Sequence, residues 1–171
     1  VSHNREALEF IICEIAPAVE REAPHTFIFH ITGNKVPAEL TQEIRGPIQY
    51  DGFVDDWETF MSRMDIALVP SLFGAGMQQK IFEPLVRGIP TVTSLRGLAD
   101  YPFQEGKQVL AAETRDEFVE CLLRLRNTEL RKTLSRNAIA VSMWLFSQAK
   151  IDGIINGGLD HIFGHRAEAL K

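Results

Sequence analysis

Short apolar runs alternate with helical apolar stripes along most of the chain. The run Ile66–Val69 is short and continuous, which is typical of a strand that is covered on both faces. The stretch Thr26–Thr32 is β-branched and aromatic and stops at a glycine, so it also predicts a strand. Three further short strands are predicted at Ile48–Tyr50, Pro90–Thr93 and Gln108–Ala112.

Between these runs, apolar residues recur at helical spacing behind polar residues that can cap a helix. Asn4 is a candidate N-cap for a helix over residues 5–21, which Pro17 should interrupt because proline lacks the amide that the helix needs. Capping boxes at Asp55 with Glu58 and at Thr114 with Glu117 predict helices over 56–63 and 115–126, and two more helices are predicted near 37–44 and from Thr128 past Trp144.

The alternation of strands and helices predicts an α/β fold with a parallel sheet, right-handed crossovers and helices on both faces. We predict one Rossmann-like domain over residues 1–150. Residues 151–171 are rich in glycine and are predicted to form a separate C-terminal tail that is weakly ordered or loosely helical.

Composition and charge narrow the possible functions. A chain of 171 residues with a net charge of −5 and no basic run is long enough for a sizeable core and argues against a nucleic-acid partner. No apolar run approaches the roughly 20 residues that span a bilayer, and the chain begins without a signal peptide, as a fragment of a longer protein would. Cys13 and Cys121 fall on apolar helical stripes, so we expect two buried free thiols and a cytoplasmic location.

The most informative stretch follows the strand at Ile66–Val69. The segment Gly74-Ala75-Gly76 predicts a loop whose backbone can approach a ligand closely, because glycine has no side chain to obstruct it. A helix is predicted to open near Met77 or Gln78 and to end at Gly88. The loop would therefore lie at the carboxyl end of a parallel strand, where open α/β sheets bind ligands.

Lys80 is an unusual residue for the first turn of a helix, because a cation there opposes the helix dipole. An anion bound to the free amides of that turn would offset this cost. Glu83 follows three residues later on the same face. From these two residues alone, a solvent-exposed Lys–Glu pair explains the pattern as well as an anion site does.

The spacing of these residues resembles the donor-binding motif of family 4 (group 1) glycosyltransferases, which have the GT-B fold. The motif reads G-x-G, then Lys80, Glu83, Gly88 and Pro90, and the segment Gly52-Phe53-Val54 with Asp56 matches a second family pattern. Two positions depart from the family: Ala75 stands where a second glutamate is usual, and Pro84 stands inside the predicted helix. The resemblance implies a donor site made of Gly33, Asn34, Phe53, Val54, Gly74, Ala75, Gly76, Met77, Gln78, Lys80 and Glu83.

The resemblance covers roughly residues 4–144 and implies the C-terminal, donor-binding half of such an enzyme. Glu83 would hold the ribose hydroxyls of a nucleotide sugar (a UDP- or GDP-sugar), and the glycine loop and helix N-terminus would face its diphosphate and sugar. The full enzyme would transfer a glycosyl group with retention, without a metal or other cofactor. The N-terminal half that binds the acceptor would be the partner of this domain. The resemblance implies that this half and the first strand of the sheet are absent here. We therefore expect the fragment alone to be inactive. For the full-length protein, the resemblance is also compatible with a peripheral position at the inner face of the membrane.

Other interpretations remain at this point. A nucleotide-sugar epimerase shares the GT-B architecture and would place its catalytic carboxylates in the absent half. A signalling receiver fits poorly, because Asp55 and Asp56 follow the wrong strand, and a dinucleotide dehydrogenase fits less well, because no G-x-G-x-x-G follows a strand. We interpret His30 as a hydrogen-bonded core residue rather than a base, and the pair His161 and His165 as an incomplete metal site.

Overall fold

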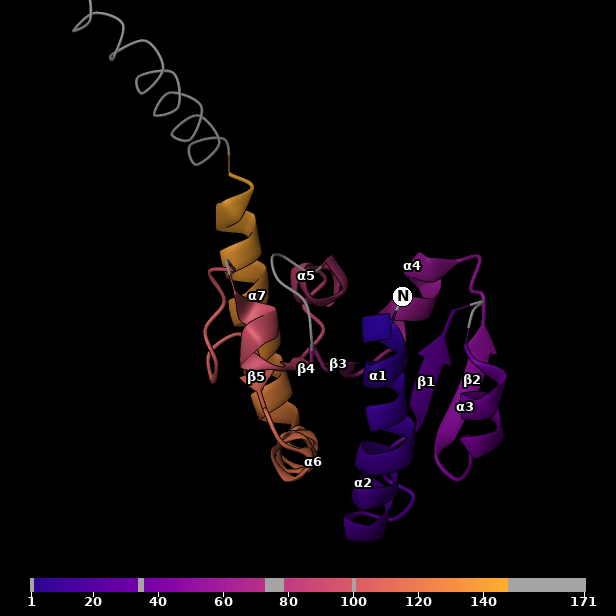
Figure 1. The fold of residues 1–171 in the computed structure, drawn as a ribbon. Helices are drawn as coiled ribbons and strands as arrows, with labels where there is room; N and C mark the ends of the chain where they lie inside the picture. The colour runs from indigo at the N-terminus through magenta and orange to yellow at the C-terminus, as the bar shows by residue number, and fades with distance from the viewer. Residues whose placement is uncertain (1, 34–35, 73–78, 100, 148–171) are drawn as a thin grey trace, which may run out of the picture.

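The strands of the computed structural model are all parallel and form two sheets (Figure 1). Residues 2–33, 36–72, 79–99 and 101–147 are described. One sheet contains β1 (Phe29–Thr32) and β2 (Ile48–Gly52), and the other contains β3 (Ala67–Val69), β4 (Thr91–Thr93) and β5 (Leu110–Ala111) in that order.

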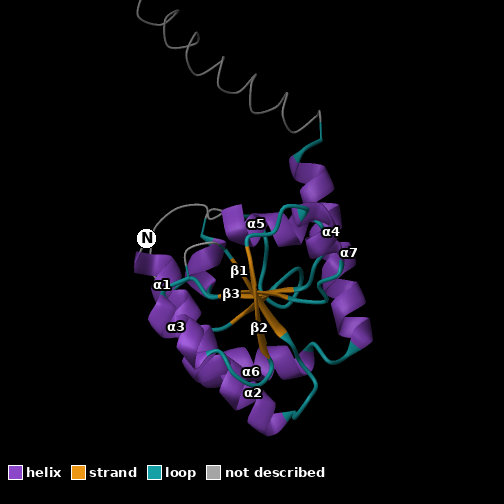
Figure 2. Cartoon of the chain, turned by 90° about the vertical axis from the view of Figure 1, so that its right-hand side faces the viewer, coloured by secondary structure: helices purple, strands orange, loops and turns teal. Residues whose placement is uncertain are grey.

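Helices cover both sides of the strands. Figure 2 shows α1, α2, α3 and α6 on one side and α4, α5 and α7 on the other. This arrangement confirms the predicted α/β fold, except that the strands are divided between two sheets. The helices are α1 (Ser2–Phe10), the π-helix η1 (Ile11–Ile15), α2 (Ala16–Glu22), α3 (Ala38–Glu43), α4 (Trp57–Ser62), α5 (Gln79–Val86), the 3-10 helix η2 (Leu95–Leu98), α6 (Arg115–Arg124) and α7 (Thr128–Leu145).

Three clusters of buried side chains hold these layers together. The largest joins α2 and α6 to β4 and β5, and it includes Phe118 and Leu110, both fully buried. A second cluster joins α5 and α7 to the opposite face of the same sheet. The third packs η1 and α3 against β1 and β2 around Ile12 and Ile31.

The first helical segment differs from its prediction in two ways. It begins at Ser2, so Asn4 lies inside the helix and is not its N-cap. Pro17 does not end the segment, which continues to Glu22, because the preceding turn is a π-helix. A π-helix changes the local hydrogen-bonding pattern, which accommodates the amide that Pro17 lacks.

The other helix starts follow the predicted chemistry more closely. Thr114 and Glu117 form the predicted capping box at the start of α6. At α4 the cap is Asp56 rather than Asp55, because the Asp56 side chain accepts the hydrogen bond from the Thr59 amide. Hydrogen bonds from the Thr59 side chain and from the Thr59 amide lower the pKa of the Asp56 carboxyl.

Gly88 lies just after the end of α5 and terminates the helix as predicted. Its φ of 72° is the left-handed conformation that favours glycine after a helix. A Cβ built on Gly88 would lie 2.6 Å from Cδ1 of Ile139, so the glycine also allows α7 to pack closely here. The end of α5 is thereby fixed against α7.

The two cysteines do not share one environment. Cys121 is buried and Cys13 is exposed, so the expectation of two inward thiols is wrong for Cys13. The helical stripe on which Cys13 was placed shifts in phase at η1, which turns this residue outward. Burial raises the pKa of the Cys121 thiol. The pKa of the Cys13 thiol is raised by burial of part of the side chain and by the nearby carboxylates of Glu43, Glu9 and Glu14. The predicted tail at 151–171, with His161 and His165, lies outside the described residues.

Among the described residues, no helix combines the length and apolar character that crossing a membrane requires.

Candidate functional site

The loops that follow β1 and β2 are tied together at the carboxyl edge of their sheet. The Gly33 amide donates to the Gly52 carbonyl over 2.7 Å, and the Tyr50 hydroxyl donates to the Gly33 carbonyl over 2.6 Å. Gly33 and Gly52 have φ values of 128° and 68°, which a residue with a Cβ rarely adopts. These bonds hold the predicted ligand loop of β1 beside the loop that carries Phe53.

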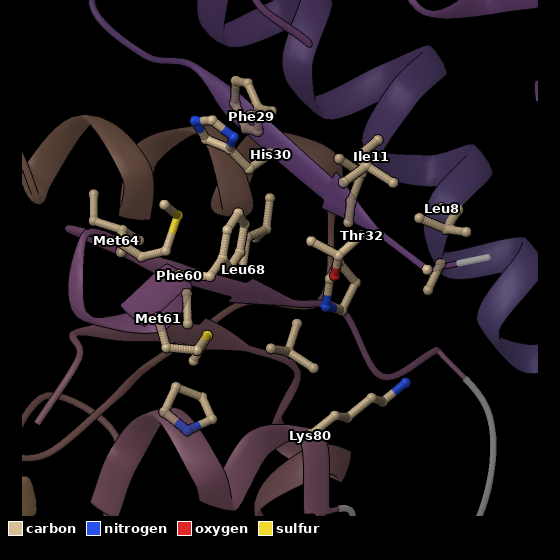
Figure 3. A pocket seen from close by; sticks show the side chains of 18 of the residues that line it. Leu8, Ile11, Phe29, His30, Thr32, Phe60, Met61, Met64, Leu68 and Lys80 are labelled. Atoms are coloured by element: carbon tan, nitrogen blue, oxygen red, sulfur yellow. The ribbon is translucent and has the colours of Figure 1, made fainter. Parts of the chain in front are cut away.

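A cavity of about 540 Å³ opens between β1 and β3 (Figure 3). Its body is apolar and is lined by side chains of η1, β1, α4 and β3, such as Ile11, Phe60 and Leu68. Polar groups line the cavity near the carboxyl ends of β1 and β3, where the first turns of α1 and α5 meet. These groups are Asn4, Gly33, Lys80 and Glu83.

Lys80 lies in the first turn of α5 and extends toward the cavity (Figure 3). Its Nζ lies 3.4 Å from Oδ1 of Asn4, a neutral partner. Although part of the side chain remains open to solvent, burial of the rest lowers the pKa of the amine. No ion pair of Lys80 with Glu83 is found in the described part of the chain, so the exposed Lys–Glu pair is not formed. The lysine is therefore a partly desolvated cation that faces a cavity.

Glu83 is held in place through one of its two carboxylate oxygens. Trp57 Nε1 donates to Oε1 over 2.7 Å, and Arg87 Nη2 lies 3.5 Å from the same oxygen. The contacts found among the described residues all involve Oε1, and Glu83 is part of the cavity lining. The side chain is 39% exposed. Glu83 can thus accept hydrogen bonds from a ligand without losing its internal contacts.

A line of aromatic contacts connects Glu83 to β1. Trp57 stacks on Phe60 with ring centroids 5.6 Å apart, and Phe60 meets His30 edge to face at 5.9 Å. His30 Nδ1 lies 2.9 Å from Asp51 Oδ2. The prediction that His30 is hydrogen-bonded is correct, but its side chain is 26% exposed, so it is not a core residue. The edge of the core is open here because β1 has a neighbouring strand on one side only among the described strands.

The structure brings together some of the predicted site residues. Gly33, Lys80 and Glu83 line the same cavity. Phe53 and Val54 do not line it, and Phe53 is 69% exposed. The remaining predicted residues, Asn34, Gly74, Ala75, Gly76, Met77 and Gln78, lie outside the described residues.

Sequence reasoning missed Trp57 and Arg87 as partners of Glu83. Arg87 follows Glu83 by four residues on α5, and this spacing on one helix was a readable signal. Trp57 is 26 positions from Glu83 and reaches it only because α4 and α5 lie on the same side of the strands. Local sequence carries no signal for that contact.

Among the described residues, no group of three His, Cys, Asp or Glu side chains is placed to hold a metal ion.

Solved structures with this fold support a common architecture. HepE of Anabaena, solved with UDP, superposes with a TM-score of 0.69 at 19% identity over 86% of this chain and 44% of that chain. TarM gives a TM-score of 0.72 at 15% identity over 87% of this chain and 32% of that one. This chain thus spans less than half the length of either. The C-terminal domain of the group 1 glycosyl transferase LpcC from Francisella tularensis superposes with a TM-score of 0.67 at 14% identity. The match covers 84% of this chain and 80% of that chain.

No curated protein matches this chain by sequence. Residues 1–128, however, match the family described as "Glycosyl transferases group 1". This match covers most of the chain and confirms the resemblance seen in the motif around Lys80 and Glu83. The structural neighbours are GT-B glycosyltransferases, and one of them is a C-terminal domain. The chain is therefore a member of the group 1 glycosyltransferases.

Proposed function

We propose that this chain is the donor-binding domain of a retaining, metal-independent glycosyltransferase and that it binds a nucleoside-diphosphate sugar at the carboxyl edge of β1 and β3. The observation that carries the proposal is the pairing of Lys80 and Glu83 on the lining of one cavity, next to Gly33. A partly buried cation and a carboxylate on the same lining suit a ligand that has both a diphosphate and a ribose.

In this proposal each end of the ligand has its own contact. Oε2 of Glu83 accepts hydrogen bonds from the ribose hydroxyls, while Trp57 holds the carboxylate through Oε1. Lys80 and the free amides of the α5 N-terminus face the diphosphate. Phe53, exposed next to Gly52, offers a ring on which the base can stack.

The chemical contribution of this domain is electrostatic. Negative charge grows on the diphosphate as the glycosyl bond breaks, and a cation and amides that already point at it stabilise that charge. Burial lowers the pKa of Lys80, and an anion bound beside the amine would favour its charged form. The acceptor-binding groups belong to the N-terminal half of the full-length protein, so the domain alone is expected to bind donor but to transfer nothing.

The ligand is expected to be a UDP- or GDP-sugar. The HepE structure with UDP supports a nucleoside diphosphate but does not decide the base. The two cysteines form no disulfide, which supports the expected cytoplasmic location, where thiols stay reduced. Nucleotide sugars and the acceptor half of the enzyme would meet the domain there.

Calorimetric titration of the chain with UDP and with GDP tests the proposal. We expect weak binding of one of them, with a Kd on the order of millimolar, because Lys80 is the one lysine or arginine on the described lining of the cavity. Glu83→Gln should abolish this binding. Glu129→Gln is the matched control, because Glu129 pairs with Lys132 at the same three-residue spacing on exposed α7. No binding of either nucleotide, or equal loss in both variants, would contradict the proposal.

A further inference from the structure

Arg87 lies at the centre of a small network of charged side chains that joins α4 to α5. Its Nη1 donates to Oε1 of Glu58 over 3.1 Å, and its Nη2 lies 3.5 Å from Oε1 of Glu83. Glu58 stands in the first turn of α4, Glu83 stands on α5, and Arg87 directly follows α5. Both helices lie on the same side of the strands (Figure 2). One guanidinium thus links the proposed ribose contact to a neighbouring helix.

The two carboxylates that share Arg87 differ in their exposure to solvent. The side chain of Glu58 is 82% exposed, whereas that of Glu83 is 39% exposed and that of Arg87 is 32% exposed. A pair with a highly exposed carboxylate is weak, because water screens the charges. The contact with Glu58 is nevertheless the shorter of the two, so Glu58 competes with Glu83 for the guanidinium.

The carboxylate of Glu83 depends on outside contacts for its orientation. The last torsion of a glutamate side chain is broad and roughly two-fold, so rotamer preference does not fix the plane of the carboxylate. Trp57 Nε1 donates to Oε1 over 2.7 Å, and a single donor still allows rotation about that hydrogen bond. Arg87 approaches the same oxygen with a planar, charged donor group. Two donors on one oxygen restrict the carboxylate plane and therefore the position of Oε2.

This orientation matters because a ribose presents two neighbouring hydroxyls. Both can donate to one carboxylate only if its oxygens lie in a suitable plane. Fixing that plane before the ligand arrives removes an ordering cost from binding. A site built to accept hydrogen bonds from hydroxyls also rejects an analogue that lacks one, because an acceptor is then left unpaired. Discrimination between ribose and 2′-deoxyribose therefore reports how well Glu83 is oriented.

We propose that Arg87 is a positioning residue that aligns the Glu83 carboxylate for the two ribose hydroxyls, and that Glu58 opposes this alignment by competing for the guanidinium. Arg87 does not belong to the described lining of the cavity, so it acts through Glu83 and not on the ligand. The planar fork is required, since it directs separate nitrogens toward the two carboxylates. This inference rests on the proposed function, because it takes Glu83 as the ribose contact.

Nucleotide pairs that differ only in the 2′-hydroxyl test the proposal. The Kd values of UDP and 2′-deoxy-UDP, and of GDP and 2′-deoxy-GDP, are measured on this chain by NMR titration. The discrimination is the Kd of the deoxynucleotide divided by the Kd of the ribonucleotide. A general loss of folded protein weakens both nucleotides alike and leaves this ratio unchanged, so the ratio separates positioning from a purely structural role.

We expect a discrimination of about tenfold in the wild type, because one hydrogen bond to a charged group is lost with the 2′-hydroxyl. Arg87→Met should lose most of this discrimination. Glu58→Gln should keep or raise it, because Glu83 is then the one carboxylate left to Arg87 among the described residues. The two halves of one ion pair are thus expected to have different effects.

Two further variants separate geometry from charge. Arg87→Lys keeps the charge but lacks the planar fork, so it should not restore the discrimination. Arg115→Met is the matched control, because it breaks an exposed pair with Asp116 on α6, on the other side of the strands. This control should leave the discrimination unchanged.

Several results would overturn the proposal. Full discrimination in Arg87→Met, or full rescue by Arg87→Lys, would contradict alignment by the guanidinium fork. A loss in Glu58→Gln as large as in Arg87→Met would assign the effect to the contact between α4 and α5 instead. A wild type that binds neither ribonucleotide, or binds one without discrimination, would remove Glu83 as the ribose contact and this inference with it. A discriminating wild type with an unaffected Arg87→Met would overturn this inference alone.

Discussion

β4 and β3 are adjacent, equally long and parallel, yet their surroundings differ sharply. β4 has strands on both sides, and Thr91, Val92 and Thr93 are all 0% exposed although two of them are polar. β3 is entirely apolar, and none of its residues is fully buried. The more hydrophobic strand is thus the less buried one, because β4 has two neighbours among the described strands and β3 has one.

This difference divides the domain into two regions with different roles. We call β4, β5, α6 and α7 the closed region, and β1, β3 and the first turns of α4 and α5 the open region. Substitutions in the closed region should change the free energy of unfolding and leave nucleotide binding alone. Substitutions at the carboxyl end of the open region should do the reverse.

The largest expected effect comes from two leucines that touch the same buried cluster from the two regions. Leu110 on β5 is 0% exposed, whereas Leu68 on β3 packs against the cluster and is only partly buried. Leu110→Ala should lower the free energy of unfolding by about 2–5 kcal/mol, because it leaves a cavity in a closed core. Leu68→Ala should cost about half as much, since some of its surface already meets water. Equal costs in urea denaturation would remove the distinction between the regions.

Glu83→Gln should give the next largest effect, on binding. In the full-length protein, Glu83→Gln removes the charge of a carboxylate that accepts hydrogen bonds from the ribose. The resulting fall in kcat/KM for the donor should correspond to a loss of about 1–3 kcal/mol of transition-state stabilisation. The free energy of unfolding should change by less than about 1 kcal/mol, since the Arg87 pair is near the surface. An unchanged kcat/KM in steady-state kinetics would sink the ribose assignment.

The pH dependence of nucleotide binding isolates Lys80. Burial lowers the pKa of its amine in the free protein, so the charged form is lost at a lower pH than for an ordinary lysine. UDP affinity should fall by up to about tenfold as pH rises through that lowered pKa, because a charge-assisted contact disappears. The free energy of unfolding should change in the opposite direction to UDP affinity. Burying the charged amine lowers this free energy at pH values below the folded-state pKa, and the loss disappears as pH rises toward the unfolded-state pKa. Calorimetry across alkaline pH should show the loss of affinity in the wild type and not in Lys80→Met.

Trp57→Phe should give the smallest effect. The variant keeps a ring that can stack on Phe60 and removes only the Nε1–H that holds Glu83. Losing one neutral donor to a carboxylate should weaken UDP binding several-fold, or about 0.5–1.5 kcal/mol, through a less fixed Glu83. Trp144→Phe on α7 is the control and should leave UDP binding unchanged. Equal weakening in both variants would mean that Trp57 acts through general packing.

The sequence predicted the order of the elements because their signals are local. The capping residues Thr114 and Glu117 and the terminating Gly88 each act within one turn of chain, and the structure has them as predicted. The errors at Pro17 and at Cys13 share one cause. A π-helix shifts the phase of the apolar stripe, and a stripe read at constant helical spacing cannot register that shift.

The site was only partly readable for a different reason. Lys80 and Glu83 sit on one helix at a spacing that the sequence displays directly. The bond from Trp57 to Glu83 and the cavity between β1 and β3 depend on how separate elements pack, and no local pattern encodes either. The family resemblance supplied the roles expected of Lys80 and Glu83, and the structure shows that both residues line one cavity.

The most direct test of the nucleotide site uses the two tryptophans of the chain, one in each region. Trp57 donates its indole N–H to Glu83, and Trp144 lies on α7 in the closed region. In a UDP titration followed by NMR, the account predicts that the indole N–H signal of Trp57 moves progressively while that of Trp144 stays fixed. A Trp57 signal that stays fixed while other signals report saturation by UDP would contradict the placement of the donor at Glu83.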